Sequence, residues 1–187
     1  MAPVIDVHTH MLNHAWLKLL EQHGRPRYTL KAVTGGLRAI HLDGAPFMTP
    51  VPPMFDWDLR VANMSKARVD IAVVSLTCPN VFWGGPEVSL KAARHMNDEF
   101  AKAQTAHPDR IRWFASLPWQ HADLATEELK RAVAKGYTVV PTLSESRAFD
   151  GVRTDPAFQE LLAQAEAGRQ LALAAFRENG GGQLLGS

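Results

Sequence analysis

The sequence predicts an α/β fold in which about five parallel strands are joined by helical crossovers. Short apolar runs of roughly four to eight residues, the type that a parallel sheet buries on both faces, alternate with longer segments whose apolar residues recur at helical spacing. Gly, Pro and Asp mark most of the boundaries between these segments. This order alone leaves two architectures open, an open doubly wound sheet and a piece of a (β/α)8 barrel.

The first predicted strand is Ile5 to His10, and a long insertion follows it. Asn13 can cap a helix that ends at Gly24. Beyond this helix, Thr34-Gly35-Gly36 separates two strand-like runs and predicts a β-hairpin. Loops at the carboxyl ends of strands carry ligand contacts in α/β folds, so we interpret the insertion as a cover for a site, with His41 exposed to solvent. The two runs are residues 28–33 and 37–42, and the predicted loop segments after them are residues 43–46 and 50–53.

Helices and strands alternate regularly in the remaining two thirds of the chain. Pro108, Gly136 and Gly168 each follow an apolar periodic segment and predict where a helix ends, while Asp155-Pro156 predicts where the last helix begins. The predicted helices are residues 59–66, 90–103, 123–133 and 156–167, and the predicted strands are residues 70–76, 111–117, 137–143 and 170–176.

The composition is that of a globular protein, and a small-molecule partner fits it better than nucleic acid or a membrane. The 187 residues are 46% hydrophobic and 21% charged, and we expect one domain over residues 1–176 with a loose tail over residues 177–187. A net charge near +1 without charged blocks favours neither nucleic acid nor a membrane as partner, and no apolar run reaches membrane-span length.

The single Cys78 excludes an intramolecular disulfide. The first residues lack a signal-peptide pattern, which predicts a cytoplasmic protein.

Two histidines at the end of the first strand, His8 and His10, are the candidate metal ligands. With a two-residue repeat, they project from one face of the strand together with Asp6. Neutral imidazole is the commonest protein ligand for zinc, and the carboxyl ends of parallel strands are where α/β folds bind ligands. The pattern predicts half of a metal site. The alternative is that the histidines contact water or a carbonyl, and Asp6 either orients a histidine or is a polar residue inside the barrel.

The loop after the second parallel strand contains the candidate substrate contacts Asn80 and Trp83. The indole can stack on a flat aromatic acid, and the amide can form a hydrogen bond with it. The alternative is a loop that only packs over the barrel mouth. We do not assign Cys78 as a nucleophile, since no base is identifiable beside it. Arg60 and Arg68 could pair with a substrate carboxylate, but we interpret them as solvated helix charges.

Several segments, in this order, resemble the amidohydrolase-2 family, specifically its branch that includes aminocarboxymuconate-semialdehyde decarboxylase and related aromatic-acid decarboxylases. The resemblance covers residues 4 to about 135, returns at residues 154–158, and is much more specific as an ordered set than the two histidines alone. The segments are Ile5-Asp6-Val7-His8-Thr9-His10, residues 68–75, His95-Met96-Asn97-Asp98-Glu99-Phe100, residues 107–110, and Trp113-Phe114-Ala115-Ser116-Leu117-Pro118.

The resemblance implies a (β/α)8 barrel with one divalent metal ion, commonly zinc, at the carboxyl ends of its strands. In this family the pair corresponding to His8 and His10 binds the metal together with a histidine after the fifth strand and an aspartate after the eighth. Decarboxylases of the family use the metal to orient a carboxylated substrate and a further histidine as acid and base, whereas hydrolases use metal-bound water as nucleophile.

The sequence departs from the family where the remaining site residues are expected. Residues 170–177 contain no histidine, so at most two family ligands are present, and we expect a truncated family member with unassigned catalytic residues. We therefore expect a partial barrel of a metal-dependent decarboxylase acting on carboxylated aromatic or muconate-like acids, impaired by truncation. The alternatives are a metal-dependent hydrolase of a cyclic amide, lactone or ester, and an inactive fragment or interaction module. Unpaired strand edges in a partial barrel also predict a homo-oligomer.

Overall fold

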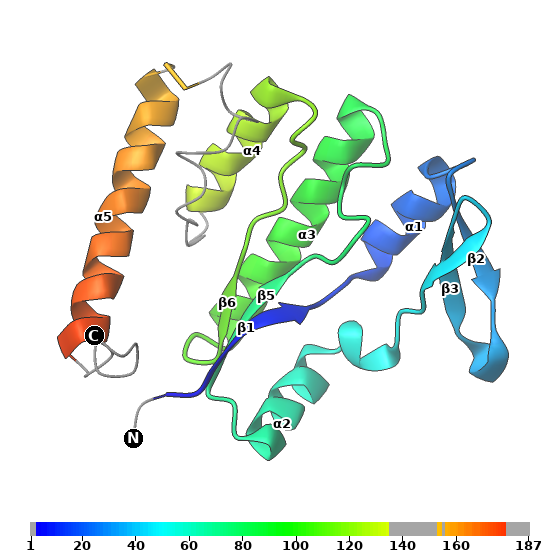
Figure 1. Cartoon of the computed structure of the whole chain (residues 1–187), viewed down its shortest axis with the longest axis horizontal. Coiled ribbons are helices and arrows are strands. Elements are labelled where there is room, and N and C mark those ends of the chain that lie inside the picture. Colours follow the sequence, from blue (N-terminus) through cyan, green and yellow to red (C-terminus); the bar gives the residue numbers. More distant parts are fainter. Residues whose placement is uncertain (1–2, 135–152, 155, 179–187) are drawn as a thin grey trace.

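The computed structural model describes residues 3–134, 153–154 and 156–178. Its main sheet has three parallel strands in the order β1-β5-β6 (Figure 1). Helices connect these strands, which confirms the predicted α/β class with parallel strands and helical crossovers. The strands are β1 (Ile5–His10), β5 (Ile71–Ser75) and β6 (Ile111–Trp113), and the helices are α1 (His14–His23), α2 (Trp57–Ala67), α3 (Pro86–Ala106), α4 (Ala122–Ala134) and α5 (Pro156–Glu178).

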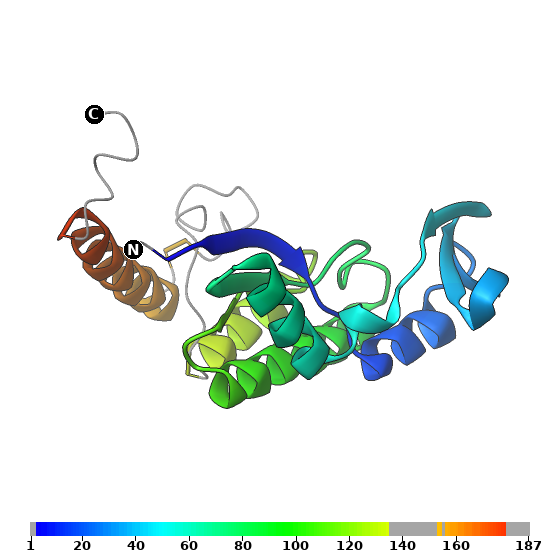
Figure 2. The same ribbon diagram turned by 90° about the horizontal axis from the view of Figure 1, so that it is seen from below.

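One face of the main sheet packs on α3. Ala72 and Val74 of β5 and Trp113 of β6 are fully buried, and they belong to the same apolar cluster as Met96 and Phe100 of α3. Figure 2 shows α3 and α4 together on one side of the sheet that contains β1. The alternation of buried and half-buried residues along β5 follows from this packing, since successive side chains in a strand point to opposite faces.

The insertion after β1 forms a second, antiparallel sheet with one strand more than predicted. Its strands are β2 (Tyr28–Ala32), β3 (Arg38–Leu42) and β4 (Ala45–Met48). The prediction of a loop over residues 43–46 was wrong for Ala45 and Pro46, which begin β4. Asp43 and Gly44 alone make the connection, because both have positive φ, as a two-residue hairpin turn requires. Pro46 lies in β4 at the edge of the sheet, a position where a missing N–H group is tolerated.

Two further predictions about single segments were wrong. His41 is buried rather than solvated, and its Nδ1 lies 3.1 Å from the carbonyl oxygen of Gly44. Residues 170–176 continue α5 instead of forming a strand. They consist of Gln, Leu, Ala and Phe without a β-branched residue, so helix propensity is high, and Gly168 costs an interior helix position only about 1 kcal/mol. Of the predicted tail, residues 177 and 178 belong to α5, and residues 179–187 lie outside the described residues, as does the predicted strand at 137–143.

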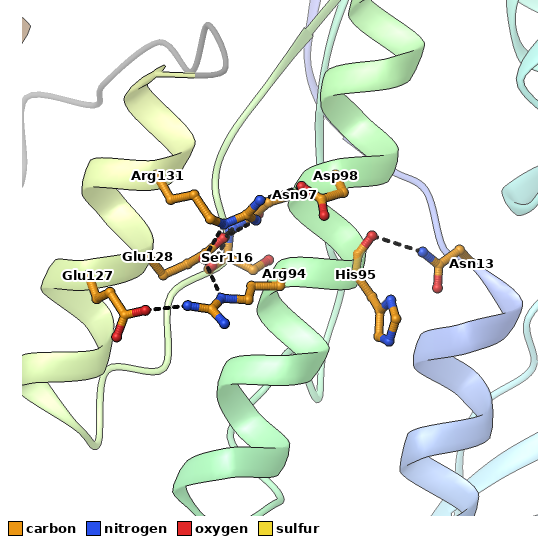
Figure 3. A network of polar contacts seen from close by, with 9 residues as sticks. All are labelled: Asn13, Arg94, His95, Asn97, Asp98, Ser116, Glu127, Glu128 and Arg131. Carbon is orange, nitrogen blue, oxygen red and sulfur yellow. Dashed lines mark hydrogen bonds and ion pairs between the residues drawn. The ribbon is translucent and has the colours of Figure 1, made fainter.

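A buried polar cluster joins α3 to α4 (Figure 3). The Glu128 carboxylate is fully buried and accepts two hydrogen bonds of 2.7 Å from the Arg131 guanidinium. Asn97 donates to Glu128 Oε1 at 2.6 Å and to the Ser116 carbonyl at 3.0 Å, and its own Oδ1 accepts from the Ser116 N–H at 2.8 Å. The cluster therefore fixes α4 and the loop after β6 against α3. None of the helices in the described ranges is long and apolar enough to cross a membrane.

We expect Glu128→Gln to lower the free energy of unfolding by about 3 kcal/mol, because it removes the fully buried carboxylate that is the main partner charge of the half-buried Arg131 guanidinium. Glu127→Gln is the matched control. Its carboxylate pairs with Arg94 but is 55% exposed, so we expect a loss of no more than about 1 kcal/mol. Urea unfolding followed by circular dichroism measures both. Equal losses in the two variants would contradict the role given to the buried carboxylate.

Candidate metal centre

The candidate site lies at the carboxyl end of β1, where this strand pairs with β5. Between Asp6 and Thr9, β1 advances three residues while β5 advances two, from Ala72 to Val74. The extra residue in β1 is a bulge, which breaks the two-residue alternation. Asp6 therefore pairs with Ala72 and His10 with Ser75, positions that are an odd number of residues apart on β5 and so lie on opposite faces of the sheet. The expectation that Asp6 shares the face of the histidines was wrong.

The two histidine side chains converge. The Nε2 atoms of His8 and His10 are 3.2 Å apart, and the rings are nearly perpendicular, with centroids 5.0 Å apart. Two imidazole nitrogens bound tetrahedrally to zinc, each at about 2.0–2.1 Å, lie about 3.3 Å apart. His8 is exposed and His10 is half-buried. The two nitrogens thus fit the positions of two ligands of one divalent ion.

Ser75 orients the His10 ring. Nδ1 of His10 lies 3.0 Å from Ser75 Oγ and 3.4 Å from the Ser75 carbonyl oxygen. With the proton on Nδ1, the ring donates to Ser75 and directs the lone pair of Nε2 towards His8, which is how metal-binding histidines are oriented by their second nitrogen.

Burial is the main cause that lowers the pKa of His10, and the charges of His8 and Arg60 lower it further. The hydrogen bond with the Ser75 backbone and the charge of Asp6 act in the opposite direction. The net effect favours neutral imidazole, the form that binds a metal ion.

The described residues supply no third ligand. Nowhere in the described ranges do three or more His, Cys, Asp or Glu side chains lie close enough together to hold a metal ion. Catalytic zinc sites ordinarily use three protein ligands plus water. The described residues therefore bring two histidines, but no third candidate ligand, to this end of β1.

Asn80 and Trp83 lie close together in the loop after β5. The Asn80 carbonyl accepts hydrogen bonds of 2.8 Å from the indole N–H groups of both Trp16 and Trp83, and the two indole rings meet edge to face at 6.4 Å. Asn80 adopts a positive φ of 56°, and its Nδ2 donates to the Leu76 carbonyl at 3.3 Å. The hydrogen-bonding capacity of the Trp83 N–H group is thus used within the loop itself. Asn80 Oδ1 is buried without a hydrogen-bond partner among the described residues.

A cleft of about 530 Å³ lies between α1 and the insertion. It is lined by His14, Leu17, Arg38, Phe55 and Asp56, among others, and His14 stacks on Phe55 with ring centroids 4.5 Å apart. None of the four predicted site residues lines it. The structure therefore brings the two histidines together and brings the two loop residues together, but it does not place either pair in this cleft.

Arg60 is a site residue that sequence reasoning missed. Its guanidinium donates from Nη1 to Thr9 Oγ1 at 2.8 Å, from Nη2 to the His10 carbonyl at 3.0 Å, and from Nε to Met11 Sδ at 3.3 Å. Its interpretation as a solvated helix charge was wrong, whereas Arg68, at the end of α2, is exposed as expected. No local pattern marks Arg60, since its three partners lie 49 to 51 residues away.

Two curated relatives are decarboxylases. The chain is 31% identical over 132 residues to the 2-amino-3-carboxymuconate-6-semialdehyde decarboxylase of Dictyostelium discoideum, a match covering 69% of this chain and 36% of that protein. It is 35% identical over 108 residues to the gamma-resorcylate decarboxylase of Rhodococcus jostii, covering 56% of this chain and 32% of that protein. The chain thus spans about a third of the length of the curated relatives that it matches. No family model matches it.

Two solved structures share the fold. The apo IDCase of Metarhizium anisopliae has a TM-score of 0.61 at 18% identity, covering 91% of this chain and 61% of that chain. The dihydroxybenzoic acid decarboxylase of Polaromonas sp. JS666, solved with manganese and the inhibitor 2-nitroresorcinol, has a TM-score of 0.51 at 24% identity. That match covers 74% of this chain and 37% of that chain. These likenesses identify the parallel sheet and its helices as part of a TIM-type barrel rather than an open doubly wound sheet.

We expect the neutral His10 ring to carry its proton on Nδ1, because Ser75 offers an acceptor there. Ser75→Ala removes Oγ and leaves only the carbonyl at 3.4 Å, so the Nδ1–H fraction falls. Nitrogen-15 NMR of the imidazoles measures the tautomer. His41, whose Nδ1 donates to the Gly44 carbonyl, is an internal control that the substitution leaves unchanged. An unchanged His10 tautomer in Ser75→Ala would refute the orienting role of this serine.

Proposed function

We propose that this chain, a relative of the amidohydrolase-2 decarboxylases, forms part of a metal-dependent carboxy-lyase for carboxylated aromatic or muconate-like acids. The observation that carries the proposal is the 3.2 Å separation of the Nε2 atoms of His8 and His10. The names of the two curated relatives support the reaction and the class of substrate.

His8 and His10 would hold one divalent cation. Nitrogen ligands favour zinc, and the manganese in the Polaromonas structure is the reason to test both ions. A bound divalent ion supplies positive charge against which a substrate carboxylate can be held. The task of the chain's own residues is to keep two neutral imidazoles at ligand spacing, with the His10 ring oriented by Ser75.

Asn80 and Trp83 are the proposed contacts to a small carboxylic acid. Asn80 Oδ1 has acceptor capacity that no described residue uses, which suits a hydroxyl group of an aromatic acid. The indole N–H of Trp83 is already bonded to the Asn80 carbonyl, so this side chain has only the face of its ring to offer. Substrate contact by the Asn80 amide requires the loop to rearrange, because Oδ1 is buried.

We expect the purified protein to bind zinc or manganese weakly and below one ion per chain, because only two ligands are present among the described residues. His8→Ala and His10→Ala should each abolish binding, measured by calorimetry and elemental analysis. His95→Ala, which changes a histidine of α3 outside the pair, is the matched control. Tight stoichiometric binding that survives loss of His8 or His10 would overturn the metal assignment.

The same preparations decide the reaction class. Carbon dioxide release from a dihydroxybenzoate in the presence of the bound ion, lost in His10→Ala, supports the carboxy-lyase. Hydrolysis of a cyclic amide, lactone or ester without carbon dioxide release would favour the hydrolase. Ion binding without turnover of either substrate class would indicate an inactive module.

We also propose that two copies of the chain associate through β1. In the described sheet β1 has a hydrogen-bonded neighbour only on its β5 side, and Val4, Ile5 and Val7 are 53%, 48% and 66% exposed. Exposed apolar strand edges promote pairing with another chain.

Size-exclusion chromatography with light scattering across a concentration series tests this association. We expect a concentration-dependent dimer that Val7→Glu shifts to monomer, because the new charge lies on the exposed edge strand. Val51→Glu, at a residue 41% exposed outside β1, should leave the dimer intact. A compact monomer of the unsubstituted chain at all concentrations would disprove self-association.

A further inference from the structure

We propose that Arg60 is a positioning residue that holds the end of β1 so that His8 and His10 keep ligand spacing. This inference rests on the proposed metal site. Arg60 lies on α2, far along the sequence from the histidines. Its proposed role is to maintain the separation of the two imidazole rings, and it does not contact the ion.

The guanidinium of Arg60 contacts three consecutive residues. Its nitrogen atoms donate to the Thr9 hydroxyl, the His10 carbonyl and the Met11 sulfur, and two of these contacts are 3.0 Å or shorter. The planar, rigid arrangement of guanidinium donors fixes several acceptors relative to one another. The helix that carries Arg60 is capped one turn earlier, where Asp56 accepts a hydrogen bond of 2.8 Å from the Leu59 N–H.

The end of β1 follows directly on a break in its pairing with β5. The bulge between Asp6 and Thr9 interrupts the pairing with β5, and the following Met11 N–H bonds the Ser75 carbonyl at 3.2 Å. Within the described sheet no strand lies on the other side of β1. Because the Met11 N–H is directed to β5, the carbonyl of the preceding residue, His10, faces away from β5, and Arg60 satisfies it. His10 is thus held through its carbonyl by Arg60 and through its ring by Ser75.

The charge of Arg60 and its positioning contacts affect the ion affinity of the site in opposite directions. A guanidinium beside a divalent cation repels it, so removal of the charge alone would strengthen ion binding. Removal of the positioning contacts would weaken it, because the two imidazoles lose their fixed separation. Loss of residues that orient metal ligands typically weakens binding by about 10- to 100-fold. The sign of the change in affinity therefore distinguishes the two roles.

The matched control is Arg110, which makes an equivalent set of contacts at the other end of β5. Its guanidinium donates to the Asp70 carbonyl at 2.7 Å, to the Val69 carbonyl at 3.0 Å and to the Ser65 hydroxyl at 3.3 Å. Arg110→Met therefore removes a comparable number of hydrogen bonds without touching the histidine pair.

The experiment measures zinc and manganese affinity of Arg60→Met, Arg60→Lys and Arg110→Met at a temperature where circular dichroism shows each variant to be folded. We expect Arg60→Met to bind at least about 10-fold more weakly than the unsubstituted chain, and Arg60→Lys to recover part of the loss, because its compact ammonium group can replace some but not all of the guanidinium contacts. Arg110→Met should lower the melting temperature but change the affinity less than about twofold. Unchanged or tighter binding by Arg60→Met, or an equal loss in Arg110→Met, overturns the proposal.

Nitrogen-15 spectra of the histidine side chains in the metal-free proteins give a readout that needs no ion. We expect the His8 and His10 resonances to shift in Arg60→Met and to stay in place in Arg110→Met. If the unsubstituted chain binds no ion, the proposed metal function fails, and these spectra still decide the role of Arg60. Identical spectra for Arg60→Met and the unsubstituted chain would overturn that role.

Discussion

The parallel pairing of β1 with β5 is the constraint on which the proposed site depends. It places Ser75 beside His10, and this one serine bonds both the His10 ring through Oγ and the Met11 N–H through its carbonyl. Because the ring and the main chain of β1 are fixed by the same residue of the neighbouring strand, the direction of the His10 lone pair follows from the sheet itself.

The helical layer holds the sheet and its loops in place at a distance from the histidines. Asn97 of α3 bonds both backbone polar groups of Ser116, just after β6, while the buried Glu128 and Arg131 join α3 to α4. On the opposite side of α3, Asn13 caps α1 and donates to the His95 carbonyl at 3.2 Å (Figure 3). The segment that leaves β1 and the loop that leaves β6 are therefore both attached to α3. A rigid helix thus fixes two segments that follow strands of the main sheet.

The fold class and the histidine pair could be predicted because their signals are local. The alternation of apolar runs with helical periodicity identifies parallel strands and crossovers, and His8 and His10 are close in space because they are close in sequence. Predictions were wrong where a single Pro or Gly was taken to interrupt an element that the neighbouring residues favour. Asp43-Gly44 forms a hairpin turn and the strand after it includes Pro46. The residues after Gly168 favour a helix strongly enough for α5 to continue through the glycine.

Long-range contacts could not be predicted from one sequence. The bulge in β1 depends on its register against β5, some 66 residues away, and only that register shows that Asp6 leaves the face of His10. No sequence pattern distinguishes Arg60 from any other charged residue on an amphipathic helix. The pairing of Asn97 with Glu128 and Ser116 likewise joins residues 19 to 31 positions apart. Side-chain roles of this kind follow only from the assembled fold.

The central claim is that His8 and His10 bind one divalent ion together through their Nε2 atoms. A zinc titration of protein labelled with nitrogen-15 at histidine, followed by NMR, tests it most directly because each ring nitrogen is observed separately. We expect the Nε2 resonances of His8 and His10 to move together with one dissociation constant, while the His41 and His95 resonances stay in place. Independent shifts of the two Nε2 resonances, or shifts confined to histidines outside the pair, would contradict it.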